Sequence, residues 1–283
     1  MAIHLERIER KRNIDGQQFP FSVPTIRRLG HLEFDRPMTF FVGENGSGKS
    51  TLTEAIAMAA ELPVVGSADG WCDPTLARQR ALAAGLSLRW RQRTRRGFFL
   101  RAEDFFGFQR RLAMERVELG ARLQEIDREY GGRSELAVGL AKGPVLGSLA
   151  EMERRYGADP DARSHGEAFL ALFGTRLVPD SLVVLDEPEA ALSPQNQVGL
   201  LALLLEMVAR GVQFIIATHS PIVLGYPGAR IYSFDGGAIG PVEYRDLDHV
   251  RLTLDFLTDP LRFLRHLMGG APASAAGESP EQP

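Results

Sequence analysis

The stretch that decides the fold is Gly43-Glu44-Asn45-Gly46-Ser47-Gly48-Lys49-Ser50, which matches the complete pattern G-x-x-x-x-G-K-S. An apolar run, Met38-Thr39-Phe40-Phe41-Val42, precedes it, and residues 50–62 carry apolar side chains at helical spacing. This order predicts a strand, a phosphate-binding loop and a helix. The glycines let the backbone N–H groups surround phosphate oxygens, and the helix N-terminus adds partial positive charge. The alternative is a glycine-rich turn before an ordinary helix.

Each position of this loop has an expected role. Lys49 is expected to reach the β- and γ-phosphates of a nucleotide, and the Ser50 hydroxyl is expected to bind Mg²⁺. The expected cofactors are therefore ATP and Mg²⁺. The full set of expected nucleotide-binding residues in the loop is Gly43, Glu44, Asn45, Gly46, Ser47, Gly48, Lys49, Ser50 and Thr51.

Length and composition exclude several classes of protein. The 283 residues allow one large or two small domains, with 44% apolar and 24% charged residues. No run of about 18 apolar residues occurs, so no membrane insertion is expected. Cys72 is the only cysteine, which excludes an intrachain disulfide and a cysteine zinc cluster and makes a cytoplasmic protein the expectation.

Arginine is concentrated in one part of the chain. The net charge is −3, but residues 78–111 contain 10 arginines and only two acids, Glu103 and Asp104. Arginines that neutralise phosphates would bind DNA or RNA, so nucleic acid is a candidate partner. The alternative is an ordinary solvated surface.

The rest of the chain alternates strand and helix patterns. Buried strands are expected at 182–185 and 212–217, with a helix at 194–210 between them, and opening strands are expected within 3–12 and 26–42. This predicts an α/β fold with a mostly parallel core sheet. Further elements are expected as follows: short strands at 86–90 and 97–100, one amphipathic helix at 105–130, and a disordered tail at 269–283.

Two of the expected strands end in reactive side chains. Asp186 and Glu187 follow the strand at 182–185, where a carboxylate can hold Mg²⁺ and a second can orient or deprotonate water. His219 follows the strand at 212–217, where it could hydrogen-bond a γ-phosphate. Alternatively, Ser220 caps a helix with Pro221 at its first position, and His219 is merely exposed.

The ordered set of a phosphate-binding loop, Asp186-Glu187-Pro188 and Thr218-His219-Ser220-Pro221 resembles the ABC-type ATPase superfamily. The sequence around Gly43–Ser50 is similar to that of the soluble branch of this superfamily. This branch contains RecF, the structural-maintenance-of-chromosomes proteins and small bacterial AAA-family ATPases without a coiled-coil arm. The resemblance covers most of residues 1–265. It implies ATP hydrolysis, with Glu187, His219 and Lys49 as catalytic residues and Ser50 and Asp186 as Mg²⁺ ligands.

The same resemblance implies a signature motif, and Ser164-His165-Gly166-Glu167 stands where it is expected. In the family this helix start covers the γ-phosphate held by a second subunit, so Ser164, Gly166 and Glu167 become candidate nucleotide contacts. Ser-x-x-Glu is also a capping box, and both interpretations can hold together.

Two positions depart from the family pattern. No glutamine follows the strand at 97–100, where Glu103 is a substitute candidate, and Ser193 stands where the family has an aspartate. Ser193 can instead cap the helix that begins at Pro194. Phe19 or Phe21 could stack on adenine, but the favoured alternative is that they pack in the core of a strand.

Taken together, the sequence predicts an ABC-type ATPase domain over 1–268. It should combine a mostly parallel core sheet, an antiparallel N-terminal sheet and a helical, basic insert at about 63–163 that carries the signature motif. The expected function is an ATP-driven homodimerisation switch with an unidentified protein partner. The alternatives are the ATPase subunit of a transporter and an ATP-regulated nucleic-acid-binding protein.

Overall fold

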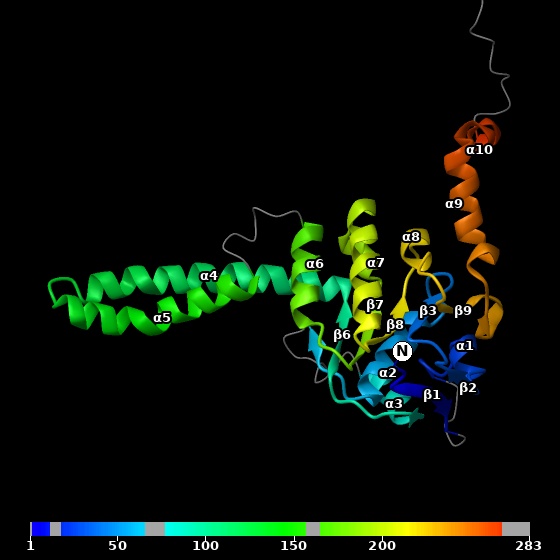
Figure 1. Ribbon diagram of the computed structural model, residues 1–283, viewed down its shortest axis with the longest axis horizontal. Helices are drawn as coiled ribbons and strands as arrows, with labels where there is room; N and C mark the ends of the chain where they lie inside the picture. Colours follow the sequence, from blue (N-terminus) through cyan, green and yellow to red (C-terminus); the bar gives the residue numbers. More distant parts are fainter. Residues whose placement is uncertain (1, 12–17, 66–76, 157–164, 268–283) are drawn as a thin grey trace, which may run out of the picture. The chain divides into compact units, whose positions relative to one another are not determined.

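A computed structural model describes residues 2–11, 18–65, 77–156 and 165–267 (Figure 1). The expected tail at 269–283 and Ser164 lie outside these residues. The chain divides into two compact units, residues 1–242 and 243–283, which are described separately below.

A seven-stranded sheet forms the centre of the first unit, in the order β10-β9-β3-β8-β7-β6-β4. Every neighbouring pair is parallel except β9 and β10. The strands are β3 (Met38–Val42), β4 (Val64–Val65), β6 (Gly97–Arg101), β7 (Leu182–Asp186), β8 (Gln213–Ala217), β9 (Arg230–Ser233) and β10 (Gly240–Pro241). The strands expected at 97–100, 182–185 and 212–217 are confirmed, and together with β3 they form the buried middle of the sheet.

A second, antiparallel sheet has three strands in the order β2-β1-β5. It contains β1 (Leu5–Arg10), β2 (His31–Glu33) and β5 (Leu86–Trp90), so the antiparallel N-terminal sheet is confirmed. The opening strands expected within 26–42 are confirmed as β2 and β3, while Ile26 lies in the short helix α1 (Pro24–Arg27). Pro24 at the first helical position favours this turn.

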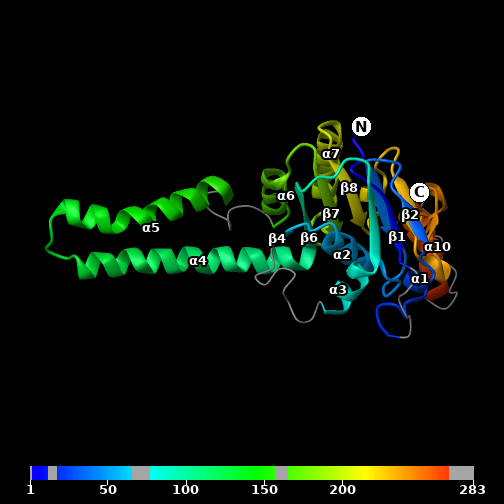
Figure 2. The same cartoon turned by 90° about the horizontal axis from the view of Figure 1, so that it is seen from below.

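Helices cover both faces of the seven-stranded sheet. Helix α2 (Lys49–Ala59) contacts β7 and β8 on one face, and α6 (His165–Arg176) and α7 (Pro194–Ala209) lie on the other (Figure 2). Successive side chains along each strand point to opposite faces of the sheet. Phe99 thus packs with α2 in the main core cluster, whereas Phe98 meets Phe173 of α6 at 5.8 Å between ring centroids.

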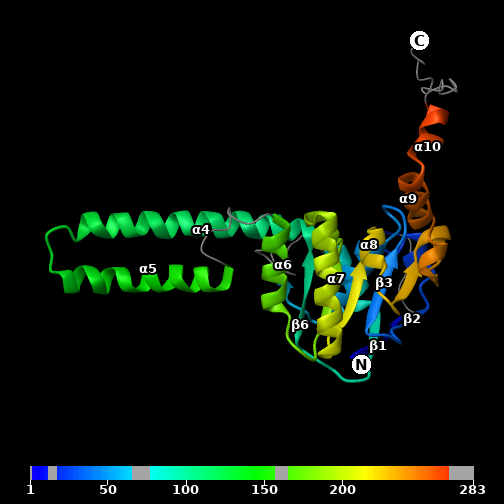
Figure 3. The same cartoon turned by 45° about the horizontal axis from the view of Figure 1, so that its top comes forward.

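A helical hairpin follows β6 directly. Helix α4 (Ala102–Glu129) and helix α5 (Glu135–Tyr156) pack against each other and extend away from the sheet in every view (Figure 3). The helix expected at 105–130 is confirmed, but α5 was not expected, because Pro144 interrupts its pattern. Residues 63–163 therefore supply β4, β5 and β6 to the two sheets as well as helices.

The remaining elements of the first unit are short. They are α3 (Ala77–Ala84), the 3₁₀ turns η3 (Pro188–Ala191) and η4 (Asp235–Gly237), and α8 (Pro221–Leu224). The second unit contains η5 (Tyr244–Asp246), α9 (Asp248–Thr258) and α10 (Pro260–Leu267). None of the helices in the described ranges combines the length and apolar character that crossing a membrane requires.

Candidate nucleotide site

The strand register brings the expected site residues to one edge of the seven-stranded sheet. Arg101, Asp186 and Ala217 are register partners on β6, β7 and β8, and Ala217 also pairs with Phe41 near the end of β3. Parallel strands end at a common edge, and ligands of open α/β sheets bind beyond it. The phosphate-binding loop, the two acids and the histidine all follow these strand ends.

The glycines of residues 43–50 adopt backbone conformations that other residues avoid. Gly43, Gly46 and Gly48 have φ values of 143°, 81° and 102°. A side chain on Gly48 would also come within 2.9 Å of the Thr25 hydroxyl. The loop can therefore close tightly, with Gly48 as the residue that caps α2.

Lys49 is held inside this loop. Its Nζ atom donates to the carbonyl oxygens of Gly43 at 2.7 Å and Glu44 at 2.9 Å, and the residue is only 4% exposed. Burial lowers the pKa of Lys49, and the nearby acids Glu187 and Asp186 act in the opposite direction. The ammonium group is thus placed between the loop and the acids at the strand ends.

Two anchors of the loop were not expected from the sequence. The Thr25 hydroxyl donates to the Ser47 carbonyl oxygen at 2.5 Å, and the Glu44 backbone N–H donates to Asp235 Oδ1 at 2.9 Å. Asp235 lies some 190 residues from the loop in the chain. Only the pairing of β3 with β9 brings it there, so a local pattern could not have revealed it.

Asp186 is a buried carboxylate at the end of β7. Burial raises the pKa of Asp186 to about 6, while Arg101, the Ser50 hydroxyl and Lys49 act in the opposite direction. Its Oδ1 atom is buried and has no hydrogen-bond partner among the described residues. An unsatisfied carboxylate oxygen beside a hydroxyl is the type of donor set that Mg²⁺ takes, so Ser50 and Asp186 fit this ion.

Glu187 has a strained backbone. Its φ and ψ of 50° and 48° lie in the left-handed region, and strain at a non-glycine residue is typical of functional sites. The Glu187 N–H donates to the Ala217 carbonyl oxygen at 2.9 Å, which fixes this turn to the end of β8. His219 Nε2 lies 3.7 Å from Glu187 Oε1. The expected base and the expected histidine therefore face one another.

Glu189 holds the loop that carries His219, and this role was not expected from the sequence. Its Oε1 atom accepts hydrogen bonds from the backbone N–H groups of His219 at 2.6 Å and Ser220 at 3.2 Å. Burial raises the pKa of Glu189. The Ser220 hydroxyl caps α8 by accepting from Ile222 N and donates to Gln197 Oε1 at 2.6 Å. The capping role expected for Ser220 is thus confirmed, and His219 is half-buried rather than merely exposed.

These strand ends define the architecture. A loop of the G-x-x-x-x-G-K-S type follows β3, an Asp-Glu pair follows β7 and a histidine follows β8, beside a separate antiparallel sheet. This is a P-loop nucleotide-binding arrangement, and the order of its motifs resembles that of ABC-type ATPases.

Two family models match separate parts of the chain. A family model described as "AAA domain, putative AbiEii toxin, Type IV TA system" matches residues 168–225, and one described as "AAA domain" matches residues 20–60. No curated protein sequence matches the chain.

Similar solved structures include ATP-binding cassettes and Smc heads. A nucleotide-free ATP-binding cassette from an ABC transporter is 19% identical, with a TM-score of 0.45, and the match covers 89% of this chain and 96% of that one. The Smc head domain with an extended coiled coil from Pyrococcus furiosus, bound to the C-terminal domain of ScpA, is 14% identical, with a TM-score of 0.43 and coverage of 91% and 99%.

The signature region is described only in part. Ser164 lies outside the described residues, and Glu167 is exposed in the first turn of α6. Gly166 is buried, and a side chain there would come within 2.2 Å of Asn196 Nδ2 on α7. The absence of a side chain at Gly166 therefore allows α6 to pack closely against α7 within one chain. Ser193 caps α7 by accepting from Asn196 N at 3.3 Å, as one of its two interpretations predicted.

At the end of β6, where the family has a glutamine, Glu103 is not the residue that reaches the site. Glu103 is exposed in the first turn of α4. Arg101, two residues earlier, instead turns toward the site and contacts Asp186. Phe21 lies in the core cluster, whereas Phe19 is 41% exposed with Arg78 over its ring. The sequence offered no signal that would have placed Arg101 rather than Glu103 at the site.

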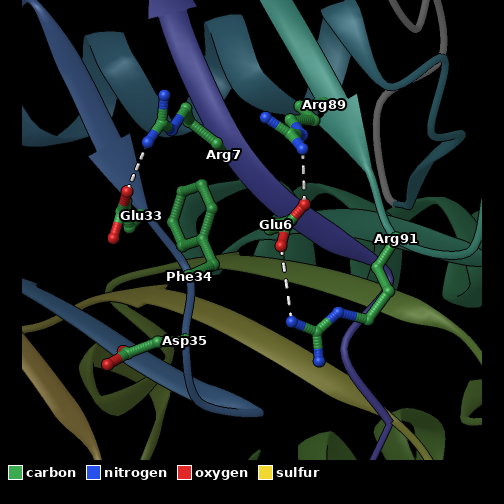
Figure 4. A pocket seen from close by; sticks show the side chains of 7 residues that line it. All are labelled: Glu6, Arg7, Glu33, Phe34, Asp35, Arg89 and Arg91. Atoms are coloured by element: carbon green, nitrogen blue, oxygen red, sulfur yellow. Dashed lines mark hydrogen bonds and ion pairs between the residues drawn. The ribbon is translucent and has the colours of Figure 1, made fainter.

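Three arginines of the arginine-rich stretch form ion pairs with nearby acids. A pocket of about 260 Å³ on the three-stranded sheet is lined by Glu6, Arg7, Glu33, Phe34, Asp35, Arg89 and Arg91 (Figure 4). Both Arg89 and Arg91 form ion pairs with Glu6, at 3.2 Å and 3.3 Å. Arg93 pairs with Glu61 at 3.7 Å. These pairs leave less positive charge for a nucleic acid than the sequence suggests.

Proposed function

We propose that this protein binds ATP with Mg²⁺, hydrolyses it, and acts as an ATP-driven dimerisation switch. The observation that carries the proposal is the convergence of Lys49, Asp186, Glu187 and His219 at one edge of the seven-stranded sheet. The ABC-type fold supports nucleotide binding, and the buried, partly unsatisfied Asp186 supports a divalent cation beside it.

Each residue has a distinct task in the proposed reaction. Lys49 places a positive charge on the phosphates, and Ser50 and Asp186 hold Mg²⁺, which supplies further charge neutralisation. Glu187 orients the attacking water and accepts its proton. His219, held by Glu189, donates a hydrogen bond toward the γ-phosphate. Catalysis then consists mainly of positioning and electrostatic stabilisation, as phosphoryl transfer requires.

Dimerisation follows from the proposed place of the signature motif. Residues 164–167 would complete the site of a second copy, so that two ATP molecules lie between two chains. Hydrolysis removes the γ-phosphate that both copies contact, and the pair then separates. ATP bound only by the paired state stabilises that state by mass action.

The variant Glu187→Gln tests both parts of the proposal. It keeps the shape of the side chain but removes the base, so phosphate release should fall at least about 100-fold while ATP affinity persists. Light scattering should then detect a dimer that forms only with ATP. A second change, Ser164→Arg, should abolish this dimer because it adds bulk and charge where the γ-phosphate must pack.

Glu206→Gln is the matched control, because Glu206 lies on α7 and pairs with Arg210 at the surface. It should hydrolyse ATP at the wild-type rate. Unchanged phosphate release in Glu187→Gln would refute the assignment of the base. A monomer with ATP fully bound would refute the dimerisation switch alone.

A further inference from the structure

Arg101 lies between two buried carboxylates beside the proposed Mg²⁺ site. Its Nη2 atom forms an ion pair with Glu54 Oε1, and its Nε atom is 3.6 Å from Asp186 Oδ2. The side chains of Glu54 and Asp186 are 6% and 5% exposed, and that of Arg101 is 24% exposed. The three groups therefore form a cluster that is largely shielded from water.

The backbone fixes how this cluster forms. Arg101 and Asp186 are register partners at the ends of β6 and β7. Glu54 lies on α2, four residues after Ser50, and residues at this spacing share one face of a helix. The helix that begins in the phosphate-binding loop thus carries both the expected Mg²⁺ hydroxyl and the carboxylate that holds Arg101.

The two carboxylates of this cluster outnumber its one guanidinium, and the other cation that acts on Asp186 is Lys49, which the loop carbonyl oxygens hold. Glu54 Oε2 and Asp186 Oδ1 have no hydrogen-bond partner among the described residues. Buried carboxylates that lack full compensation are costly. A divalent cation on Asp186 would supply the missing charge, and Arg101 would no longer be needed there.

Arg101 is also the residue from which the hairpin begins. Helix α4 starts at Ala102, and Arg101 occupies its N-cap position in an extended conformation. The backbone of Arg101 therefore joins the strand that ends at the site to the first turn of α4. No other residue of the cluster belongs to the strand that leads into the hairpin.

We propose that Arg101 is a positioning residue that competes with Mg²⁺ for Asp186 and links the state of the metal site to the base of the α4–α5 hairpin. Without the cation, Arg101 is shared between Glu54 and Asp186. With the cation on Asp186, Arg101 pairs with Glu54 alone, and the start of α4 adjusts. The inference rests on the proposed function, because it requires Mg²⁺ at Ser50 and Asp186.

Two substitutions should change Mg²⁺ affinity in opposite directions. Arg101→Met removes the competing charge while keeping an unbranched side chain that matches the aliphatic part of arginine, so Mg²⁺ should bind at least about threefold more tightly in the presence of a non-hydrolysable ATP analogue. Glu54→Gln leaves Asp186 as the only carboxylate partner of Arg101, so Mg²⁺ should bind at least about threefold more weakly. Arg101→Lys should lie near the wild type. Calorimetry on the full chain measures all three affinities.

Hydrogen exchange provides the readout for the hairpin. In the wild type, Mg²⁺ with the ATP analogue should change the exchange of amides in the first two turns of α4. This response should be lost in Arg101→Met and kept in Arg122→Met, which removes an exposed arginine farther along the same helix. If Arg101→Met fails to fold, Glu54→Gln alone tests the direction of the effect.

The possible outcomes separate this inference from the proposed function. If the wild type fails to bind Mg²⁺ with the ATP analogue, the proposed function fails. If it binds and both variants change Mg²⁺ affinity in the same direction or not at all, only the link through Arg101 is overturned. A wild-type exchange response that persists in Arg101→Met overturns the coupling to the hairpin.

Discussion

Two charged regions of this protein differ in how far their carboxylates are buried and how fully these are paired. On the three-stranded sheet, acids and arginines are partly exposed and satisfy one another, as in the pair Arg7–Glu33 at 2.5 Å (Figure 4). At the edge of the seven-stranded sheet, Glu54 and Asp186 are buried and each keeps an unsatisfied oxygen. Exposed pairs contribute little to stability, whereas buried carboxylates cost free energy unless something binds them.

The comparison supports the proposal that the second region is the functional one. A solvated carboxylate loses little free energy when its partner is removed. Substitutions of the paired charges on the three-stranded sheet should therefore cost little stability. A buried carboxylate that keeps a free oxygen indicates a ligand that offsets the cost of burial. We therefore expect substitutions at the edge of the seven-stranded sheet to change hydrolysis most and substitutions on the three-stranded sheet to change it least.

The largest effect is expected from Asp186→Asn. The amide cannot supply the negative charge that the proposed Mg²⁺ requires, so hydrolysis should fall at least about 100-fold. The same change should stabilise the metal-free protein. Burial raises the pKa of Asp186 to about 6, so ionisation of this carboxyl destabilises the fold.

The sign of the pH dependence follows from linkage. A carboxyl whose pKa is raised by folding contributes stability at low pH, and this contribution is lost as the pH rises through about 6. In chelator, Asp186→Asn should therefore match the wild type near pH 4 and exceed it above pH 6, by up to about 3 kcal/mol. Urea unfolding at several pH values measures the difference. A wild type that is more stable than Asp186→Asn at pH 8 would show that ionised Asp186 does not destabilise the fold.

Asp35→Asn is the matched substitution in the first region and should behave in the opposite way. The hydrogen bond from Arg230 lowers the pKa of Asp35, so this carboxylate stabilises the fold above its unfolded pKa and loses that effect as the pH falls. The variant should thus be slightly less stable than the wild type at pH 7 and equal to it at low pH. Hydrolysis should not change.

An intermediate effect is expected at Glu189. Glu189→Ala removes the acceptor that fixes the backbone of His219 and Ser220, so kcat should fall roughly 10- to 100-fold with little change in ATP affinity. Glu189→Gln keeps an oxygen acceptor and should restore most of the activity. Equal losses in the two variants would show that the negative charge, rather than the hydrogen bonds, is what matters.

The smallest effect is expected for the binding of nucleic acid by the arginines at 91–96. Arg91 and Arg93 already form ion pairs, so Arg95 and Arg96 are the members of the turn with most charge to offer. Two phosphate contacts correspond to a slope of about −2 in log affinity against log salt. Any DNA binding should therefore have a slope no steeper than this, and reversal of all four arginines to glutamate should leave ATP binding intact. A much steeper slope would mean that other basic residues contact DNA.

Patterns local in sequence predicted much of this molecule. The loop at 43–50, the strand that ends at Asp186 and the caps at Ser193 and Ser220 depend on neighbouring residues, and the structure has each of them. The second hairpin helix was missed because Pro144 and several glycines weaken its helical pattern.

The other missed features depend on contacts between distant segments. Asp235 reaches Glu44 through the pairing of β9 with β3, and Arg101 reaches Asp186 through the register of β6 with β7. Glu189 was within reach of sequence analysis, since it lies two residues after Glu187. Its role nevertheless requires the position of the loop after β8. A pattern can thus name the residues of a site without giving the contacts that hold them.

The most direct test of the central claim is the ATP affinity of wild type and Lys49→Ala, measured by calorimetry with Mg²⁺ and with chelator. We expect the wild type to bind ATP with Mg²⁺, the chelator to weaken this binding, and Lys49→Ala to weaken it about 10- to 100-fold because a buried positive charge on the phosphates is lost. Equal affinity in the two proteins would contradict a nucleotide site at the end of β3.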